Sequence, residues 1–404
     1  MKKIFKIAMV AACPFPYPRG TPVRIFRMAE ALTQKGHEVH VITYHLGNEL
    51  NGALFKVHRI KDIITYQKHS PGPTYQKLIV VDPLLAVKLY KFLKQNEVDI
   101  IHAHNYEGLL VASLVKMFKK LPIIYDAHTI LESELPYYNL GFSKKIIKRI
   151  GSYLDRRLPR MADYIITVTD TIRTKIIQDS GIDSKNITTL MNGIEREHFN
   201  IKKDYCEIHK NGRKTLIFTG NTAAYQRIDL LLKVLREILN KRQDIQLLII
   251  SDSPFNYYES LANKLQVRSY VNVISSEFNS LPKYLAEADI SLNPRTDCDG
   301  IPQKLLNYMA AGRAVVSFSG SGKILEHGKT GWIVENGNVN AFANAVLFLL
   351  DNPMIAQKLG DNAREYINLE HTWEKVAEGA EDIYERVLRE NHSSASSPIF
   401  VPNS

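Results

Sequence analysis

Residues 299–316 read Asp-Gly-Ile-Pro-Gln-Lys-Leu-Leu-Asn-Tyr-Met-Ala-Ala-Gly-Arg-Ala-Val-Val. Proline near the start of an apolar-faced segment and glycine just after its end are typical of a helix, and the apolar run beyond is typical of a buried strand. We therefore predict a helix over Lys304–Ala311 and a strand over Ala314–Phe318, separated by Gly312. A helix followed by such a strand is the repeating unit of doubly wound α/β folds.

The start of the predicted helix has the chemistry of an anion site. The first amide groups of a helix have no partner within the helix, so near Pro302 they can bind a phosphate. Lys304 and Asn307 are three residues apart and share one helical face. A phosphate and a ribose could both be held there. A purely structural unit, ended by proline and glycine, would use the same residues.

Apolar runs alternate with helical patterns on both sides of this stretch. In the second half, strands are expected at 215–219, 246–251, 271–274 and 290–293, and helices at 228–240, 257–265 and 281–286. In the first half, strands are expected at 4–12, 38–43, 99–103, 121–125 and 164–168, and a helix at 24–35. This alternation implies parallel strands joined by crossover helices.

The polar stretch 192–214 has little periodicity and separates the two series. We predict two doubly wound, Rossmann-like α/β domains at 1–195 and 215–370, joined by a linker at 196–214. A C-terminal helix at 371–390 is expected to pack back towards the first domain, and a disordered tail is expected at 391–404. Ligands of such sheets bind beyond the carboxyl ends of the strands. The expected site is therefore a cleft between the two domains.

Composition and charge narrow the class of partner. The 404 residues are 45% hydrophobic and 23% charged, as in globular proteins, and the formal net charge of +10 favours anionic partners. These partners include phosphates, nucleic acid and acidic lipid. No helix-turn-helix, zinc-finger or RNA-binding aromatic signature accompanies the charge, so we expect no nucleic acid.

Cysteine usage and the start of the chain indicate the compartment. The three cysteines, Cys13, Cys206 and Cys298, are too few and too far apart for a disulfide scaffold or a cysteine zinc module, and they fit a reducing cytosol. The sequence has no apolar run of about 18 residues that would span a membrane. The apolar start ends at Pro14 and Pro16, as in a buried first strand rather than a signal peptide. We expect a cytoplasmic protein.

Several motifs resemble those of the family-4 glycosyltransferases, which are retaining enzymes of the GT-B fold. The segment 299–316 resembles their nucleotide-sugar signature, and Gly322-Lys-Ile-Leu-Glu-His-Gly-Lys-Thr-Gly-Trp-Ile-Val334 resembles the donor loop that follows it. Further matches occur in the expected order, at 101–104 (IHAH), 125–128 (YDAH), 191–194 (MNGI) and 219–229 (TGNTAAYQRID). The resemblance implies a GT-B fold and a nucleoside-diphosphate sugar as donor.

The resemblance also implies roles for residues of the second half. In the family, two acidic residues eight positions apart lie beside the transferred sugar and the ribose, and the matching residues here are Asp299 and Asn307. Asn307 lacks the charge, which weakens a hydrogen bond to the ribose. A family arginine and lysine that neutralise the diphosphate are replaced by Asn221 and Gln226, which follow Gly220.

Other cations are expected to replace the lost charge, because a leaving diphosphate needs positive charge or aligned amides. We assign this role to Arg227 and Lys304, with Lys323 as a further candidate. Exposed, solvated side chains on a turn would account equally well for these cations. Glu326 matches a family glutamate at the start of a helix that faces the donor, and Gly322 would let the backbone approach a phosphate.

In the first half, the resemblance implies roles for residues that follow strands. Gly20 and Thr21 occupy the place of two family glycines that contact the donor phosphate or the acceptor, although one glycine in a turn is a weak signal. His128 follows an apolar strand and matches a family histidine that contacts the transferred sugar or the acceptor. Asp126 shares its face of an extended segment. We also assign His104 and Asp126 to the acceptor side and expect His102 to be packed in the core.

A basic amphipathic stretch covers residues 143–160. Seven Lys and Arg residues and one Asp give it a charge of +6, and isoleucines and leucines recur at helical spacing. Such a helix can lie on an anionic membrane surface, where each basic residue contributes about 1 kcal/mol. An ordinary domain helix with solvated charges has the same pattern. Binding would place the protein peripherally at the inner face of the membrane, as suits a lipid-linked acceptor.

The leading hypothesis is a retaining glycosyltransferase that moves a sugar from a nucleoside-diphosphate sugar to a hydroxyl of a glycan or lipid-linked acceptor. We expect same-face substitution assisted by the leaving phosphate, because the sequence offers no obvious nucleophile. We expect no metal or cofactor, since no Asp-x-Asp motif follows a strand. Two alternatives stay open: a weakened sugar-nucleotide-binding or membrane-scaffold protein, and a GT-B sugar-nucleotide epimerase.

Overall fold

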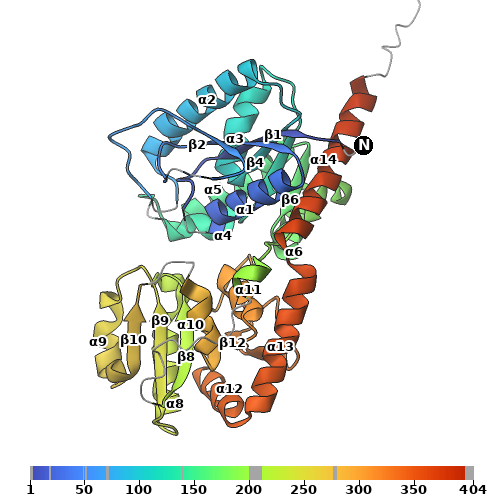
Figure 1. The fold of residues 1–404 in the computed structure, drawn as a ribbon. Helices are drawn as coiled ribbons and strands as arrows, with labels where there is room; N and C mark the ends of the chain where they lie inside the picture. Colours follow the sequence, from blue (N-terminus) through green and yellow to red (C-terminus); the bar gives the residue numbers. More distant parts are fainter. Residues whose placement is uncertain are drawn as a thin grey trace, which may run out of the picture. The chain divides into compact units, whose positions relative to one another are not determined.

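The computed structural model describes residues 3–17, 20–48, 50, 52–69, 72–138, 140–199, 212–275 and 280–395. The chain forms two compact units, one of Met1–Asn192 with Trp373–Ser404 and one of Gly193–Thr372 (Figure 1). Each unit contains one parallel sheet covered by helices. This is the architecture expected from the alternation of apolar runs and helical patterns.

The first unit is built on a seven-stranded parallel sheet with the order β3-β2-β1-β4-β5-β6-β7. Its strands are β1 (Lys6–Ala11), β2 (Glu38–Thr43), β3 (Lys56–Arg59), β4 (Ile100–His104), β5 (Ile123–Ala127), β6 (Tyr164–Thr167) and β7 (Ile187–Thr189). The strand order reverses between β1 and β4. Ligands of doubly wound sheets bind at such a reversal, beyond the carboxyl ends of the strands.

Helices cover both faces of this sheet. They are α1 (Gly20–Gln34), a π-helix (Lys77–Val81) that continues into α2 (Asp82–Gln95), α3 (Asn105–Lys116), α4 (Leu131–Glu134), α5 (Lys144–Arg157), α6 (Asp170–Ser180) and α14 (Trp373–Ala395). Side chains alternate across a strand, so Ala8 of β1 lies in one core and Ile7 in the other. The core that contains Ile7 also holds Trp373 and Tyr384 of α14. The last helix therefore belongs to the first unit.

The second unit is built on a six-stranded parallel sheet with the order β10-β9-β8-β11-β12-β13. Its strands are β8 (Lys214–Thr219), β9 (Ile245–Ile250), β10 (Val271–Ile274), β11 (Ile290–Asn293), β12 (Ala314–Phe318) and β13 (Trp332–Val334). Its helices are α7 (Arg196–Phe199), α8 (Ile228–Leu239), α9 (Asn256–Lys264), α10 (Leu281–Glu287), α11 (Gln303–Ala310), α12 (Val339–Asp351) and α13 (Pro353–Glu370). Buried apolar clusters lie on both faces of the sheet.

The structure differs from the sequence predictions mainly at boundaries and edges. Part of the expected linker forms α7, because Phe199 packs with Ile194 in a core of the second unit. The rest of the linker, 200–211, lies outside the described residues, as does Cys206. Helix α14 continues to Ala395, into the expected tail, and 396–404 are not described.

Three short strands escaped prediction. They are β3, β7 and β13, each at an edge of its sheet, and they have three or four residues. So few residues show no clear periodicity, and pairing with a longer neighbour decides whether they form strands.

No single helix of the described residues is long and apolar enough to cross a membrane. Helices α12 and α13 meet the length and composition requirements only as a pair, and the pair bends by 101°.

Candidate active site

Polar side chains gather at the carboxyl ends of β4 and β5 in the first unit. His102 and His104 lie two residues apart on β4, so both point to one face of the sheet. Asp126 on β5 pairs in register with His104. His128 follows the end of β5. Arg24, in the second turn of α1, reaches this group from the helix that follows β1.

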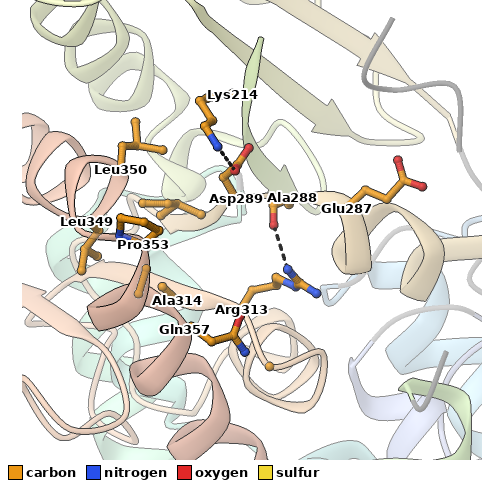
Figure 2. Close-up of a pocket in the computed structure, with 13 residues that line it drawn as sticks. Lys214, Glu287, Ala288, Asp289, Arg313, Ala314, Leu349, Leu350, Pro353 and Gln357 are labelled. Carbon is orange, nitrogen blue, oxygen red and sulfur yellow. Dashed lines mark hydrogen bonds and ion pairs between the residues drawn. The ribbon is translucent and has the colours of Figure 1, made fainter. Parts of the chain in front are cut away.

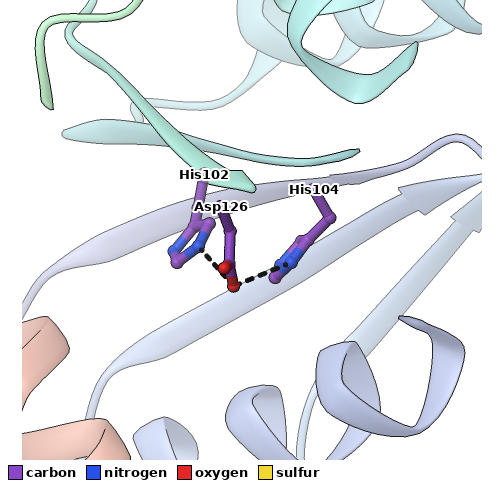
Figure 3. A group of neighbouring side chains, drawn as sticks. All are labelled: His102, His104 and Asp126. Atoms are coloured by element: carbon purple, nitrogen blue, oxygen red, sulfur yellow. Dashed lines mark ion pairs between the residues drawn. The ribbon is translucent and has the colours of Figure 1, made fainter. Parts of the chain in front are cut away.

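The Asp126 carboxylate is the centre of this group, which we call the Asp126 cluster (Arg24, His102, His104, Asp126 and His128). Asp126 Oδ2 lies 2.8 Å from Arg24 Nε and 3.3 Å from His104 Nδ1. It lies 3.5 Å from His102 Nε2 and 3.5 Å from His128 Nε2. Figure 3 shows the carboxylate between the two imidazoles of β4. The side chains of Arg24, His102, His104 and Asp126 are at most 1% exposed.

Three further side chains surround the cluster. The Thr21 hydroxyl, at the first turn of α1, lies 2.9 Å from His128 Nδ1. The Tyr384 hydroxyl of α14 lies 2.6 Å from His102 Nδ1. Arg24 donates a second hydrogen bond, of 2.9 Å, to Asn192 Oδ1. Arg24 is thus held between Asp126 and Asn192, and His102 between Asp126 and Tyr384.

The charges of the cluster follow from burial and from the Arg24 guanidinium. Burial by itself would raise the pKa of Asp126, but Arg24 and then the imidazoles, His128 first, hold it well below its usual range. Burial lowers the pKa of His102, and it lowers the pKa of His104 to about 3, with a further contribution from His102. At neutral pH the cluster therefore contains an ionised carboxylate, a guanidinium and two neutral imidazoles on β4.

A metal ion would find three ligands here, two imidazoles and a carboxylate, because one ligand atom each of His102, His104 and Asp126 lies within 4.8 Å of the others. The same carboxylate oxygen, however, already accepts a hydrogen bond from Arg24. A divalent cation would add two positive charges beside a buried guanidinium and would share the one carboxylate with which Arg24 pairs among the described residues. The residues fit an ion pair better than a metal centre.

The second unit places three of the predicted donor residues together beyond the carboxyl end of β8. Lys304, in the first turn of α11, donates a hydrogen bond of 2.6 Å to Gln226 Oε1. Its ammonium also lies 3.9 Å from the centre of the Phe218 ring. Gly220 has a φ of +129°, and a Cβ there would lie 3.4 Å from Gln226 Nε2 and 3.6 Å from Lys304 Nζ.

Lys304 is a buried cation whose neighbours do not neutralise it. Burial lowers its pKa well below the usual range, and Arg295 lowers it further. Within the part of the chain that the structure describes, the partner of its ammonium is an amide oxygen and no carboxylate. An anion at this place would gain both a charge-assisted hydrogen bond and the amide groups at the start of α11.

Arg227 differs from Lys304 in its surroundings. It has a left-handed φ of 58°, and its Nε and one terminal nitrogen each lie 3.0 Å from a carboxylate oxygen of Asp229. Its other terminal nitrogen lies 3.4 Å from Thr296 Oγ1. The charge that we expected to face a diphosphate is thus shared with a carboxylate two residues away. Asn221 bonds to Tyr225 within its own loop.

The remaining predicted donor residues lie along α11 and the turns after β12. Asn307 is buried in α11, and Asp299 lies half-buried in the loop before it. Gly322 packs closely on β12, since a Cβ there would lie 2.9 Å from Ser317 Oγ. Lys323 is exposed.

The prediction that Glu326 begins a helix is wrong. The residue lies in a series of turns between β12 and β13, next to an isolated bridge between His327 and Gly331. Its carboxylate forms an exposed ion pair of 2.8 Å with Lys329. Gly328 and Gly331 allow the chain to turn tightly here, so the segment closes as turns where the sequence predicts a helix.

Sequence reasoning missed the residues that hold the predicted ones in place. Arg24 and Tyr384 lie on helices whose apolar spacing gives no sign of a buried polar contact. Asn293 on β11 donates hydrogen bonds to Ser317 and Ser321, of 2.8 and 2.7 Å. For Asn293 and its two serine partners, the sequence did contain a signal, because they are short polar residues near strand ends.

A cavity of about 500 Å³ lies elsewhere in the second unit. Figure 2 shows its lining, with Lys214 next to Asp289 and Arg313 next to the backbone of Ala288. Lys214 and Ala314 are the first residues of β8 and β12. The cavity is thus at the amino ends of the strands, the end opposite to that used for ligands in this fold class.

Comparison with known proteins agrees with the arrangement of both units. Residues 18–198 match the family model described as Glycosyltransferase Family 4, and residues 213–352 match the model described as Glycosyl transferases group 1. The two models together span most of the chain, one on each unit. The chain is a glycosyltransferase of the family-4-like type.

A curated relative matches this glycosyltransferase over nearly its full length. N-acetyl-alpha-D-glucosaminyl L-malate synthase of Bacillus anthracis is 24% identical over 93% of this chain and 96% of its own. Among solved structures, sucrose-phosphate synthase from Thermosynechococcus elongatus superposes with a TM-score of 0.81 at 16% identity, over 96% of this chain and all of the other. HepE from Anabaena, in complex with UDP and glucose, gives a TM-score of 0.71 at 16% identity over the same shares. The fold is GT-B.

Proposed function

We propose that this glycosyltransferase transfers a sugar from a nucleoside-diphosphate sugar to a hydroxyl group, with retention of the anomeric configuration. The surroundings of Lys304 carry the donor assignment: its buried amino group has an amide as its only described hydrogen-bond partner and lies at the start of an eight-residue helix beside Gly220. A diphosphate would supply the missing negative charge. The structure of HepE, a structural neighbour, is a complex with UDP and glucose.

The second unit is the donor unit in this proposal. Gly220, Gln226 and Lys304 hold the diphosphate, and Asn307 the ribose. Asp299 lies beside the transferred sugar, and Gly322 lets the backbone approach a phosphate, with Lys323 and Glu326 as further contacts. The first unit carries His128, Gly20 and Thr21 as contacts for the reacting groups. Retention rests on the resemblance of 299–307 to the donor signature of retaining enzymes.

Replacement of Lys304 by methionine tests the donor site. Methionine keeps the length and packs against Phe218, so the variant should be at least as stable as the wild type, because an uncompensated buried ammonium is removed. Titration calorimetry with a panel of nucleoside-diphosphate sugars should show that binding weakens by about 10-fold or more, a loss typical of a charge-assisted hydrogen bond. Lys358→Met, at an exposed lysine of α13 in the same unit, is the matched control for the loss of one charge. Unchanged donor affinity in Lys304→Met would contradict the proposal.

We propose that no metal takes part. Among the described residues, His102, His104 and Asp126 are the only His and Asp group with metal-ligand spacing. The Arg24 guanidinium already pairs with the Asp126 carboxylate, which supports the proposal. Turnover in the presence of EDTA should equal turnover with added Mg²⁺ or Mn²⁺. Loss of turnover with EDTA and its recovery with one of these ions would overturn this part.

A glycan or lipid-linked acceptor at an anionic membrane surface is the acceptor proposal. Helix α5 turns Ile147 into the core but leaves Ile146, Ile150 and Tyr153 about half exposed, at 47, 45 and 59%. Phe142, just before the helix, is 59% exposed. Basic residues lie between these apolar side chains, an arrangement that suits the interface of an anionic leaflet, such as the inner face of the cytoplasmic membrane.

Liposome flotation tests the membrane surface. The protein should float with vesicles that contain acidic lipid and not with neutral ones, and high salt should weaken the binding. A variant with Ile146, Ile150 and Tyr153 changed to serine should lose flotation, while serine at exposed Met354 and Leu369 of the second unit should not change it. Equal behaviour of the two variants would remove α5 as the docking surface.

A sugar-nucleotide-binding scaffold is the second candidate. Three features favour it. Arg227 pairs with Asp229, and the neutral Asn221 stands where the family has a cation, so both reduce the positive charge at the donor. The neutral Asn307 stands where the family has an acidic residue, which weakens the hydrogen bond to the ribose. Product analysis by NMR separates the candidates. Binding of a nucleotide sugar without hydrolysis or transfer across an acceptor panel would favour the scaffold, and an epimerised donor formed without acceptor would reveal an epimerase.

A further inference from the structure

One carboxylate in the first unit faces three imidazoles. An ionised carboxylate only accepts hydrogen bonds, so each imidazole nitrogen that faces Asp126 Oδ2 must carry a proton to interact favourably. These nitrogens are Nε2 of His102, Nδ1 of His104 and Nε2 of His128, at 3.5, 3.3 and 3.5 Å, and the interaction is electrostatic because none of them forms a hydrogen bond within the described residues. A neutral imidazole has one N–H, so its second nitrogen is then an acceptor.

The second nitrogen of each imidazole has a different neighbour. His102 Nδ1 accepts from the Tyr384 hydroxyl at 2.6 Å, and His104 Nε2 is buried with no partner among the described residues. His128 Nδ1 lies 2.9 Å from the Thr21 hydroxyl, which then donates to it. Of the three, His128 is the most exposed, with 9% of its side chain accessible against 0% for the other two. His128 is therefore the imidazole of the three that a substrate can most readily reach.

We propose that Asp126 is a positioning residue for His128: its ionised carboxylate, 3.5 Å from Nε2, favours a proton on that nitrogen and thereby leaves Nδ1 as the acceptor for a substrate hydroxyl, which takes the place of Thr21. This inference rests on the proposed function, since it needs a substrate with a hydroxyl beside His128. It goes beyond the contact that family resemblance implies, because it assigns the tautomer, the acceptor atom and the residue that imposes both.

The surroundings of Asp126 suit a rigid support. Arg24 Nε holds the carboxylate at 2.8 Å, and Asn192 holds the guanidinium in turn. The rings of His102 and His104 are stacked, with centroids 4.5 Å apart and planes at 11°. The His104 ring also meets the His128 ring edge to face, at 5.6 Å. A side chain fixed by several buried contacts keeps its partner within the narrow geometry that a reacting group needs.

Nitrogen NMR of the full-length protein with labelled histidine tests the tautomer directly. Comparison with His128→Gln identifies the His128 signals. The expected spectrum has a protonated Nε2 and an unprotonated Nδ1 at neutral pH. A protonated Nδ1, alone or together with Nε2, would overturn the proposal. This measurement needs no turnover, so it stays decisive even if no nucleotide sugar proves to be a substrate and the proposed function fails.

Kinetics of Asp126→Asn test whether the support matters for the reaction. We expect kcat to fall by about 10-fold or more while the KM for the donor stays within about 2-fold, because orientation of His128 is lost and the donor unit is intact. Asp155→Asn removes another buried carboxylate of the same unit and should leave kcat unchanged. Equal effects of the two variants, or full activity of Asp126→Asn, would show a structural role only. If Asp126→Asn does not fold, the NMR result on the wild type decides.

Discussion

Lys304 and Arg227 lie in opposite electrostatic surroundings, although both are candidates for the same anion. Lys304 is buried against an amide and an aromatic ring, whereas Arg227 is about one-third exposed and shares its charge with Asp229. A buried cation without a counter-charge is costly unless a ligand supplies one, while an exposed ion pair contributes little to stability. At the scale of single residues, Lys304 is therefore the stronger candidate for the diphosphate.

Substitution of Arg227 by alanine separates its two possible uses. We expect the stability to change by less than about 1 kcal/mol, because the ion pair with Asp229 is exposed. We expect turnover to fall by about 10-fold if Arg227 releases Asp229 and binds the diphosphate. The control is Asp229→Ala, which frees the guanidinium and should keep or improve donor affinity. Full turnover of Arg227→Ala would reject a phosphate role.

At the scale of single elements, the two faces of helix α5 have different surroundings. Asp155 accepts hydrogen bonds from the backbone N–H groups of Leu131 and Glu132, at 3.0 and 2.8 Å, and so ties α5 to the start of α4. Gly151 allows close approach, because a Cβ there would lie 2.6 Å from Leu131 O. The opposite face carries the exposed isoleucines and basic residues. A core-facing anchor thus leaves the outer face available for docking.

Asp155 predicts a pH dependence of stability. Burial raises its pKa to about 6, against the opposing effect of the two N–H groups, from a usual value of 3.8. A folded-state pKa above the unfolded one means that ionisation opposes folding, so this group costs stability as pH rises from about 4 to 6. Denaturation of the wild type and of Asp155→Asn should show a stability difference that grows by roughly 1–3 kcal/mol in favour of the variant over that range. A difference independent of pH would contradict this reading.

At the scale of the whole molecule, the last helix stabilises the unit that contains the first strand. Tyr384 of α14 is fully buried in the core of the first unit, packs edge to face on Phe5 and holds His102 through its hydroxyl. Residues almost 380 positions apart are therefore part of one core. Loss of α14 would expose apolar surface of the first unit and loosen the Asp126 cluster.

Replacement of Tyr384 by alanine should destabilise the first unit by about 3–5 kcal/mol, the cost of a large cavity and a lost buried hydrogen bond. Arg389→Ala, on the same helix with an exposed side chain, should stay within about 0.5 kcal/mol. Two-step thermal unfolding followed by calorimetry should show the shift in one transition only. A shift of both transitions, or of neither, would argue against a stabilising role confined to the first unit.

The sequence predicted the central strands and long helices well, because period-2 and period-3.6 patterns are local properties of the chain. It placed Lys304 and Asn307 on one helix and His128 after a strand, and the structure shows them there, with Asp126 within that strand. It failed at Glu326, where turns replace the expected helix, and at β3, β7 and β13, where pairing decides the structure.

The sequence by itself determined the α/β class, the two parallel sheets and the family. These properties depend on hydrophobic periodicity and on motifs that are continuous in the chain. Only the tertiary structure decided that Lys304 is buried without a carboxylate, that Arg227 pairs with Asp229, and that Arg24 and three histidines converge on Asp126. Charge and tautomer depend on burial and on neighbours distant in sequence, and no local pattern contains that information.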